Sequence, residues 1–238
     1  LLLERIRRLS PADPAAKRAH DALAGWDGRI DAAATAPTLY AATRRALTRL
    51  LLDRSGLAKA AGDPLLAGPP PVAPMMQAWW MLPTLLRTDD PSLLGGLTWD
   101  AAIEQALAIA AAEPARTWAD AHRPRFVHPL SARFPEAAGM LDPTARPVGG
   151  DNDCVLATGL LAGVGLAAAY GPVARYVFDV GDWEASRWIV FHGTSGLPGH
   201  PHWEDQHALW ASGSLVPMHY AEDRVEAAAI HSQVLAPA

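Results

Sequence analysis

The spacing of apolar residues changes about halfway along the chain, and this change limits the folds that the sequence can adopt. Over 36–53 apolar residues recur every three or four positions, which is the period of a helix with one buried face: Leu39, Ala46, Leu47 and Leu50. Beyond residue 114 glycine, proline and β-favouring residues become more frequent, and the helical period fades. The sequence therefore predicts an α+β fold, with a mainly helical segment over 1–114 and a strand-rich segment over 115–238.

Start and stop signals place the individual elements. In the first segment we expect helices over Asp13–Leu23, Ala36–Asp53, Met75–Leu86 with an interruption or a kink at Pro83, and from Thr98 to just before Pro114, with a loop over Gly68–Pro71. In the second segment we expect two strands joined by a turn at Gly181-Asp182, and a terminal helix: Tyr176–Val180, Ser186–His192 and Asp223–Ser232. The stretch Ala157–Ala169 fits either a helix of small residues or a bulged strand.

Composition excludes several classes of protein. The 238 residues carry a formal net charge of −5, so a nucleic-acid partner, which needs a basic surface, is not expected. A single cysteine, Cys154, excludes an internal disulfide and a cysteine-rich metal site. The apolar run Cys154–Tyr170 is too short to span a bilayer and is broken by glycines. The chain opens with Leu-Leu-Leu-Glu-Arg, without a methionine or a signal peptide, which predicts the middle of a longer polypeptide.

Four segments of the second half occur in a fixed order and together resemble one family. They are WADAHRPRFVHPL over 118–130, GGDNDCV over 149–155, GPVARYVFDVGD over 171–182 and GTSGLPGHPHWEDQHALWASG over 193–213. This set resembles the C-terminal part of the large (β) subunit of the penicillin acylase family of N-terminal-nucleophile hydrolases. The sequence departs from the family at Thr194, where glutamine is common, and in the GDND run. The WDG that begins at Trp26 is a weaker upstream match.

The resemblance implies a fold and an activity. The fold is an αββα sandwich, two antiparallel sheets between helical layers. The activity is hydrolysis of linear amides, including side-chain amides of penicillins, acyl-homoserine lactones and lipopeptides. The implied partners are the N-terminal part of the β subunit, the small α subunit and a small-molecule amide, in the periplasm or outside the cell. The family's calcium ligands and oxyanion-hole asparagine lie upstream, so no cofactor is expected in this chain.

The nucleophile of the family is the first residue of the large subunit, freed by self-cleavage. Its hydroxyl or thiol is activated by its own α-amine, whose pKa near ~8 leaves a fraction unprotonated at neutral pH. Leu1 offers neither hydroxyl nor thiol. We therefore expect this chain alone to hydrolyse no amide.

Two charged residues of the third segment are candidates for the site. Asp179 ends an expected strand, and in cephalosporin-acylase relatives an acidic residue at the matching position pairs with the active-site histidine. The resemblance thus implies that Asp179 orients a base, whereas the structural alternative is a carboxylate that caps the turn at Gly181. On a strand, Arg175 would face the same side as Asp179. It would form a structural salt bridge or neutralise a carboxylate of the site.

The fourth segment allows two further interpretations. Ser195, His202 and Asp205 have the residue types of a catalytic triad, but Pro198 and Pro201 favour a loop without a nucleophile elbow. We expect these three residues to pack near the site and not to form an independent triad. His200, His202 and His207 give the alternative of a zinc-dependent hydrolase, although His-Pro-His is not a usual ligand spacing.

The chain as a whole, and the GGDNDCV segment within it, each allow a second interpretation. The chain could be a non-catalytic binding or scaffold domain derived from such an enzyme. The run Asp151-Asn152-Asp153 resembles the start of a calcium loop, but the residues after it are apolar. We therefore expect a polar turn at this position.

Overall fold

The computed structural model describes residues 1–57 and 72–237, so the expected loop Gly68–Pro71 lies outside the described residues. Contacts divide the chain into unit 1, Leu1–Arg125 with Pro147–Gly171, and unit 2, Phe126–Arg146 with Pro172–Ala238. The predicted division at residue 114 follows secondary structure, whereas the units follow tertiary contact. The whole of the predicted helical segment lies in unit 1.

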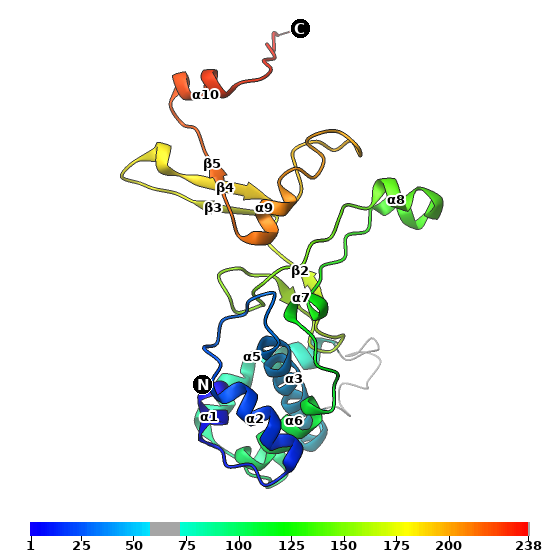
Figure 1. The fold of residues 1–238 in the computed structure, drawn as a ribbon, viewed down its shortest axis with the longest axis vertical. Coiled ribbons are helices and arrows are strands. Elements are labelled where there is room, and N and C mark those ends of the chain that lie inside the picture. The colour runs from blue at the N-terminus through cyan, green and yellow to red at the C-terminus, as the bar shows by residue number, and fades with distance from the viewer. Residues whose placement is uncertain (58–71, 238) are drawn as a thin grey trace. The chain divides into compact units, whose positions relative to one another are not determined.

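Unit 1 contains every helix that the sequence predicts over 1–114, and the helix with Pro83 inside it runs on without a break (Figure 1). Its elements are α1 (Leu2–Arg8), α2 (Pro14–Ala24), α3 (Ala36–Ser55), α5 (Val72–Thr88), η1 (Ser92–Leu94), α6 (Trp99–Ala111), α7 (Trp118–Ala121), β1 (Gly159–Leu160) and β2 (Ala168–Tyr170). Strands β1 and β2 pair in antiparallel fashion with an irregular register at Gly159 and Leu160. The ambiguous stretch over 157–169 therefore forms two short strands and no helix.

Local signals explain where these helices begin and end. The Asp13 carboxylate accepts hydrogen bonds from the N–H groups of Ala15 and Ala16, both at 2.8 Å, and so caps α2. Helix α6 is capped in the same way, because the Thr98 hydroxyl accepts from the Ala101 N–H at 3.2 Å. Helix α3 ends at Gly56, whose φ of 78° lies in the left-handed region that favours glycine.

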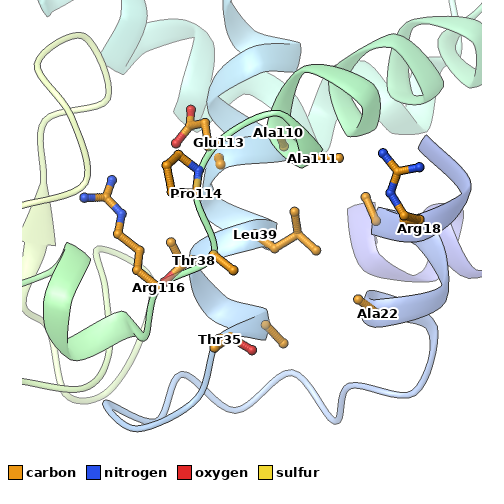
Figure 2. Close-up of a pocket in the computed structure, with 14 residues that line it drawn as sticks. Arg18, Ala22, Thr35, Thr38, Leu39, Ala110, Ala111, Glu113, Pro114 and Arg116 are labelled. Carbon is orange, nitrogen blue, oxygen red and sulfur yellow. The ribbon is translucent and has the colours of Figure 1, made fainter. Parts of the chain in front are cut away.

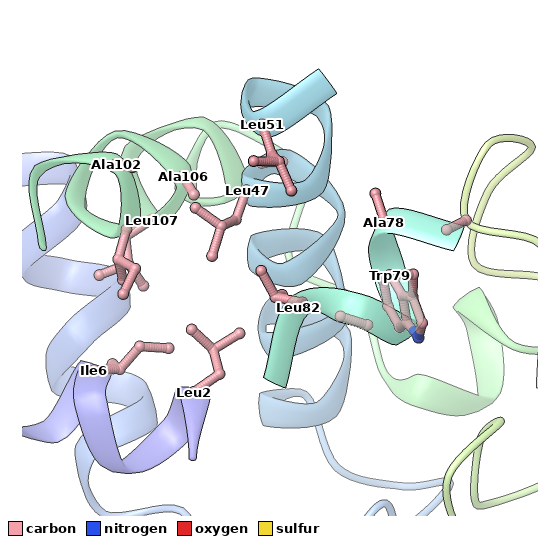
Figure 3. Close-up of a cluster of buried hydrophobic side chains, with 14 of the residues drawn as sticks. Leu2, Ile6, Leu47, Leu51, Ala78, Trp79, Leu82, Ala102, Ala106 and Leu107 are labelled. Carbon is pink, nitrogen blue, oxygen red and sulfur yellow. The ribbon is translucent and has the colours of Figure 1, made fainter. Parts of the chain in front are cut away.

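The helices of unit 1 enclose a continuous apolar core (Figure 3). The side chains of Leu47 on α3, Leu82 on α5 and Leu107 on α6 are fully buried there. Burying a side chain of this size stabilises the fold by roughly 1.5–3 kcal/mol. Ala102 and Ala106 on α6 are also fully buried, and such small side chains let two helices approach closely. This core holds the helical half together.

Arg44 of α3 joins three segments of unit 1. Pro83 inside α5 has no N–H to donate to the carbonyl of Trp79, four residues earlier. The Arg44 guanidinium donates to that carbonyl at 3.0 Å and lies 3.9 Å from the centre of the Trp79 ring. It also donates to the Asp153 carboxylate at 2.7 Å. Since Arg44 is only 7% exposed, these contacts replace the water that its charge loses on burial.

Unit 2 is built around a three-stranded antiparallel sheet in the order β3-β4-β5. Its elements are η2 (Pro129–Ala132), η3 (Pro135–Ala137), α8 (Ala138–Leu141), β3 (Ala174–Val177), η4 (Trp183–Ala185), β4 (Arg187–Val190), α9 (His207–Ser212), β5 (Val216–Pro217) and α10 (Glu222–Ala228). The predicted pairing of two strands across a turn is confirmed. The α+β class is also confirmed, since helices accompany one sheet of two strands and one of three strands in the described residues.

Three predicted elements in unit 2 have the wrong bounds. The strand expected over Ser186–His192 runs from Arg187 to Val190. The strand expected over Tyr176–Val180 runs from Ala174 to Val177, because the Asp179 carboxylate binds the N–H groups of the following turn and ends the ladder. The terminal helix expected over Asp223–Ser232 ends at Ala228. The residues that follow it are exposed, so no tertiary packing supports a longer helix.

The two faces of the unit 2 sheet have different surroundings. Arg175 and Ile189 are cross-strand partners, and α9 packs against β4 on their side. On the other side Tyr176 stacks on Trp188 and on Phe178, with nearly parallel rings. Tyr176 and Phe178 are both more than half exposed.

No helix in the described parts of the chain combines the length and the apolar character that a membrane span requires.

Replacing Arg44 tests how far unit 1 depends on this side chain. Arg44→Met removes a buried charge from Asp153 and a donor from the Trp79 carbonyl, so we expect the free energy of unfolding to fall by about 3 kcal/mol. Arg49→Met is the matched control, because Arg49 pairs with Asp53 on the exposed side of α3 and should cost less than about 0.5 kcal/mol. Urea denaturation measures both. Equal losses in the two variants would contradict this role of Arg44.

Candidate functional site

Asp179 lies just beyond β3 and is exposed. One oxygen of its carboxylate accepts from the N–H of Gly181 at 2.9 Å and from the N–H of Asp182 at 3.0 Å. The Asp179 N–H donates to the Ser186 hydroxyl at 3.1 Å, across the hairpin. This is the geometry of the turn cap. Among the described residues no base is hydrogen bonded to this carboxylate.

Arg175 does not form the predicted salt bridge within residues 1–57 and 72–237. Its guanidinium donates to the Trp210 carbonyl at 2.6 Å and lies 4.6 Å from the centre of the Trp210 ring. The Nε and Nη2 atoms are buried and have no hydrogen-bond partner among the described residues. Among the described residues α9 places a tryptophan, and no acidic side chain, beside β3. Burial lowers the pKa of this guanidinium.

The three residues of the triad pattern lie close together in one loop. His202 Nδ1 and Asp205 Oδ2 are 2.8 Å apart, and the Ser195 N–H donates to the His202 carbonyl at 2.9 Å. The Ser195 hydroxyl, however, accepts from the Leu197 N–H at 3.1 Å, and no hydrogen bond joins it to an imidazole among the described residues. A side chain at Gly193 would collide with the His202 carbonyl, so the loop is tightly packed.

The histidines of the zinc alternative do not converge on one point. His207 Nδ1 donates to the Phe191 carbonyl at 2.8 Å, and His207 Nε2 accepts from the Arg146 N–H at 3.1 Å. Neither nitrogen of His207 is therefore free to bind a metal ion. Nowhere in the described parts of the chain do three potential ligands come together. These residues do not fit a zinc site.

Aromatic rings surround a further histidine, His192, just after β4. Its ring lies 4.5 Å from Phe126 in an edge-to-face contact and 3.8 Å from Phe191. Its Nδ1 is buried without a hydrogen-bond partner among the described residues. Burial, aided by the nearby His207, lowers the pKa of His192 to about 4. His192 is therefore neutral at physiological pH.

The family model for penicillin amidase matches residues 1–227. The chain belongs to the penicillin amidase family. It is 52% identical over 224 residues to penicillin acylase 2 proenzyme from Pseudomonas sp. (strain SE83). The aligned region covers 94% of this chain and 29% of the proenzyme. A thermostable penicillin G acylase from Alcaligenes faecalis matches with a TM-score of 0.46 and 19% identity, over 99% of this chain and 45% of that chain. The chain thus spans less than a third of the proenzyme that it matches.

The GGDND motif of this penicillin amidase family member forms a structural junction in unit 1. The Trp118 indole donates to the Gly150 carbonyl at 2.9 Å, and the Thr158 hydroxyl donates to the Gly149 carbonyl at 2.7 Å. Gly150 has a φ of 76°, and a side chain there would overlap the Leu156 carbonyl. The glycines are therefore required by the close approach of the backbone.

The polar residues of the motif are bound within unit 1. The Asn152 amide contacts the N–H and carbonyl of Leu160 at 2.9 and 3.1 Å and the Tyr170 hydroxyl at 2.6 Å. Asp151 accepts from the Asp153 N–H, and Asp153 pairs with Arg44. The predicted polar turn is confirmed, because hydrogen bonds and an ion pair account for these side chains.

Sequence reasoning missed His122 as a member of this junction. Its ring lies between the carbonyls of Leu166 and Thr158, at 2.6 and 2.8 Å, and stacks on Trp118 at 4.3 Å. Burial lowers the pKa of His122, and its two carbonyl partners and Asp151 oppose this shift. The signal in the sequence is the spacing of four residues between Trp118 and His122, which puts both rings on one side of a helical turn.

The pKa of His192 predicts the pH dependence of stability. The unfolded chain binds a proton at His192 more readily than the folded chain, so the free energy of unfolding should decrease as pH falls from about 6.5 towards about 4. His192→Phe keeps the aromatic contacts and removes the titrating group, so this part of the decrease should disappear. Urea midpoints at several pH values measure both proteins. An unchanged acid dependence in the variant would show that other groups cause it.

Proposed function

We propose that this chain is the C-terminal portion of an amidohydrolase that cleaves linear amides, with the nucleophile supplied from outside this chain. The observation that carries the proposal is the 52% identity to a penicillin acylase proenzyme over 94% of the chain. The substrate class would be the acyl side-chain amide of a β-lactam, an acyl-homoserine lactone or a lipopeptide. The enzyme would act in the periplasm or outside the cell.

The chemistry of acyl transfer explains why further chain is required. The reaction needs a nucleophile with an adjacent base, and donors for the oxyanion. The Ser195 hydroxyl is bonded to a backbone N–H and, among the described residues, to no base, and the chain spans only 29% of the proenzyme that it resembles. The described residues therefore supply scaffold and supporting groups. In this proposal the catalytic atoms belong to the N-terminal part of the β subunit.

The exposed apolar face of the unit 2 sheet supports the proposal that other protein covers it. Tyr176 and Phe178 stack on one another but are each more than half exposed, and Val180 in the following loop is 81% exposed. Apolar surface of this kind is usually covered by other protein. The proposed occupants are the N-terminal part of the β subunit and the small α subunit.

A self-contained binding or scaffold domain is the second candidate. The observation that favours it is the closed apolar core of unit 1, which forms from residues of this chain alone. A cooperative melting transition of the purified chain, without binding of a dye for apolar surface, would favour this candidate. Strong dye binding that falls on co-expression with the N-terminal part would favour the amidohydrolase.

The activity itself can be measured directly. We expect the full-length protein to hydrolyse phenylacetyl, glutaryl or long-chain acyl amides, and the 238-residue chain alone to hydrolyse none of them. Ser195→Ala in the full-length protein should leave kcat unchanged, because its hydroxyl contacts no base among the described residues. Turnover by the chain alone that is lost in Ser195→Ala would overturn the proposal in favour of an independent triad.

Asp179 is proposed to orient the base of the complete enzyme, and two substitutions separate this role from the turn cap. Asp179→Asn keeps an oxygen for the N–H groups of Gly181 and Asp182 but removes the charge, so kcat should fall ~100-fold with little change in melting temperature. Asp179→Ala also removes the cap, which should cost about 1 kcal/mol of stability. Asp182→Asn, at the neighbouring cap of η4, is the control. Full kcat in Asp179→Asn would exclude Asp179 from the site.

A further inference from the structure

A groove of about 290 Å³ lies in unit 1, between the start of α1 and α5. Most of its lining is apolar and comes from these two helices: Leu1, Leu2, Trp80, Leu82, Pro83 and Leu86. Figure 3 shows two of these side chains, Leu2 on α1 and Leu82 on α5. The charged side chains of the lining, Arg44 and Asp153, pair with each other at 2.7 Å. The groove therefore favours an apolar occupant over a charged one.

Trp80 leaves a large apolar surface uncovered at this groove. It is 51% exposed, whereas its neighbour Trp79 on the same helix is fully buried. Leu1, at the other side of the groove, is 47% exposed. Exposed apolar surface that includes an indole usually marks a contact with other protein.

The backbone at the start of α1 lacks acceptors that a longer chain would supply. The Arg5 N–H donates to the Leu1 carbonyl at 3.0 Å and is the first to have a partner one turn earlier. Leu1 holds the N-cap position, where its side chain cannot accept a hydrogen bond. Residues that continue the helix upstream of Leu1 would provide carbonyls for the N–H groups before Arg5.

We propose that the groove holds the chain that directly precedes Leu1, as a continuation of α1. The choice of this occupant rests on the proposed function, in which the N-terminal part of the β subunit precedes this chain. The aligned region is only 29% of the proenzyme, so the relative has further chain to supply.

The reach of the backbone restricts where such a segment can lie. Consecutive Cα atoms are ~3.8 Å apart, so the first residues before Leu1 have to lie close to Leu1, which itself lines the groove. On a continued helix, the residues three and four positions before Leu2 share its face. These residues cover Trp80 and close the groove.

A second hollow of unit 1 provides the control position. It measures about 260 Å³ and lies between α2, α3 and the segment that follows α6 (Figure 2). Its lining includes the exposed Ala22 of α2 and, among the described residues, no residue of α1 or α5. The segment before Leu1 should therefore not reach it.

A photoreactive side chain identifies the occupant in the full-length protein. Trp80→p-benzoylphenylalanine keeps an aromatic ring in the groove, and on illumination this group bonds covalently to C–H groups in contact with it. A helix rises ~1.5 Å per residue, so mass spectrometry of the digest should place the bond within about ten residues before Leu1. Ala22→p-benzoylphenylalanine is the control and should form no bond to that segment.

Other adducts would contradict the proposal. A bond from position 80 to a different segment, or no bond to protein at all, shows that the preceding chain does not fill the groove. A mixture of ordinary and isotope-labelled protein detects a bond between two copies, which would likewise overturn it.

Amide hydrogen exchange on the unmodified full-length protein is the second measurement, and it does not depend on whether a variant folds. If α1 continues upstream, the N–H groups of Leu2, Leu3 and Glu4 donate to carbonyls of the preceding turn. Their exchange should then be at least about 100-fold slower than in an unstructured chain. Exchange at the unstructured rate would show that the helix begins at Leu1 and would overturn the proposal.

An amide-hydrolysis assay on the unmodified full-length protein separates the two proposals. Adducts to the preceding segment, in a protein that hydrolyses no amide, would support the occupied groove and contradict the proposed function. Hydrolysis together with adducts elsewhere would overturn the occupied groove and leave the proposed function standing.

Discussion

The buried charge of Arg44 is the constraint on which the arrangement of unit 1 depends. An arginine cannot give up its proton at physiological pH, so the surrounding structure has to supply partners for the guanidinium. Those partners are the Trp79 carbonyl, which Pro83 leaves without its helical donor, the Trp79 ring and the Asp153 carboxylate. Because all of these groups contact the same guanidinium, Arg44 holds α3 against α5 and against the GGDND turn.

The sequence predicts those features that depend on local chemistry. Helices α2, α3, α5 and α6 follow from apolar spacing and from caps such as Asp13 and Thr98. The end of β3 was harder to predict, because the Asp179 side chain competes with the strand partner for backbone N–H groups. Partners distant in the chain could not be predicted. The two residues that Arg44 bonds lie 35 and 109 positions away, and no local pattern encodes such pairs.

The loop over 193–206 shows why residue types alone do not make a catalytic site. It brings Ser195, His202 and Asp205 together, as the sequence suggests, and the imidazole and carboxylate are hydrogen bonded. The contact that a nucleophile needs, from hydroxyl to base, is replaced by backbone bonds that hold the loop in shape. The geometry of this loop therefore differs from that of a catalytic triad, although the residue types match.

The junction around Gly150 also bears on the order in which the chain folds. It ties together the backbone of Ile30, the indole of Trp118 and the ring of His122, and His122 in turn binds the Leu166 carbonyl. Most of the helical core comes from residues up to the end of α6, so it can assemble early as the chain leaves the ribosome. The junction closes only after residue 166 has been synthesised. Until then the rings of Trp118 and His122 lack the carbonyls that hold them, so this part of the nascent chain stays open after the helical core has formed.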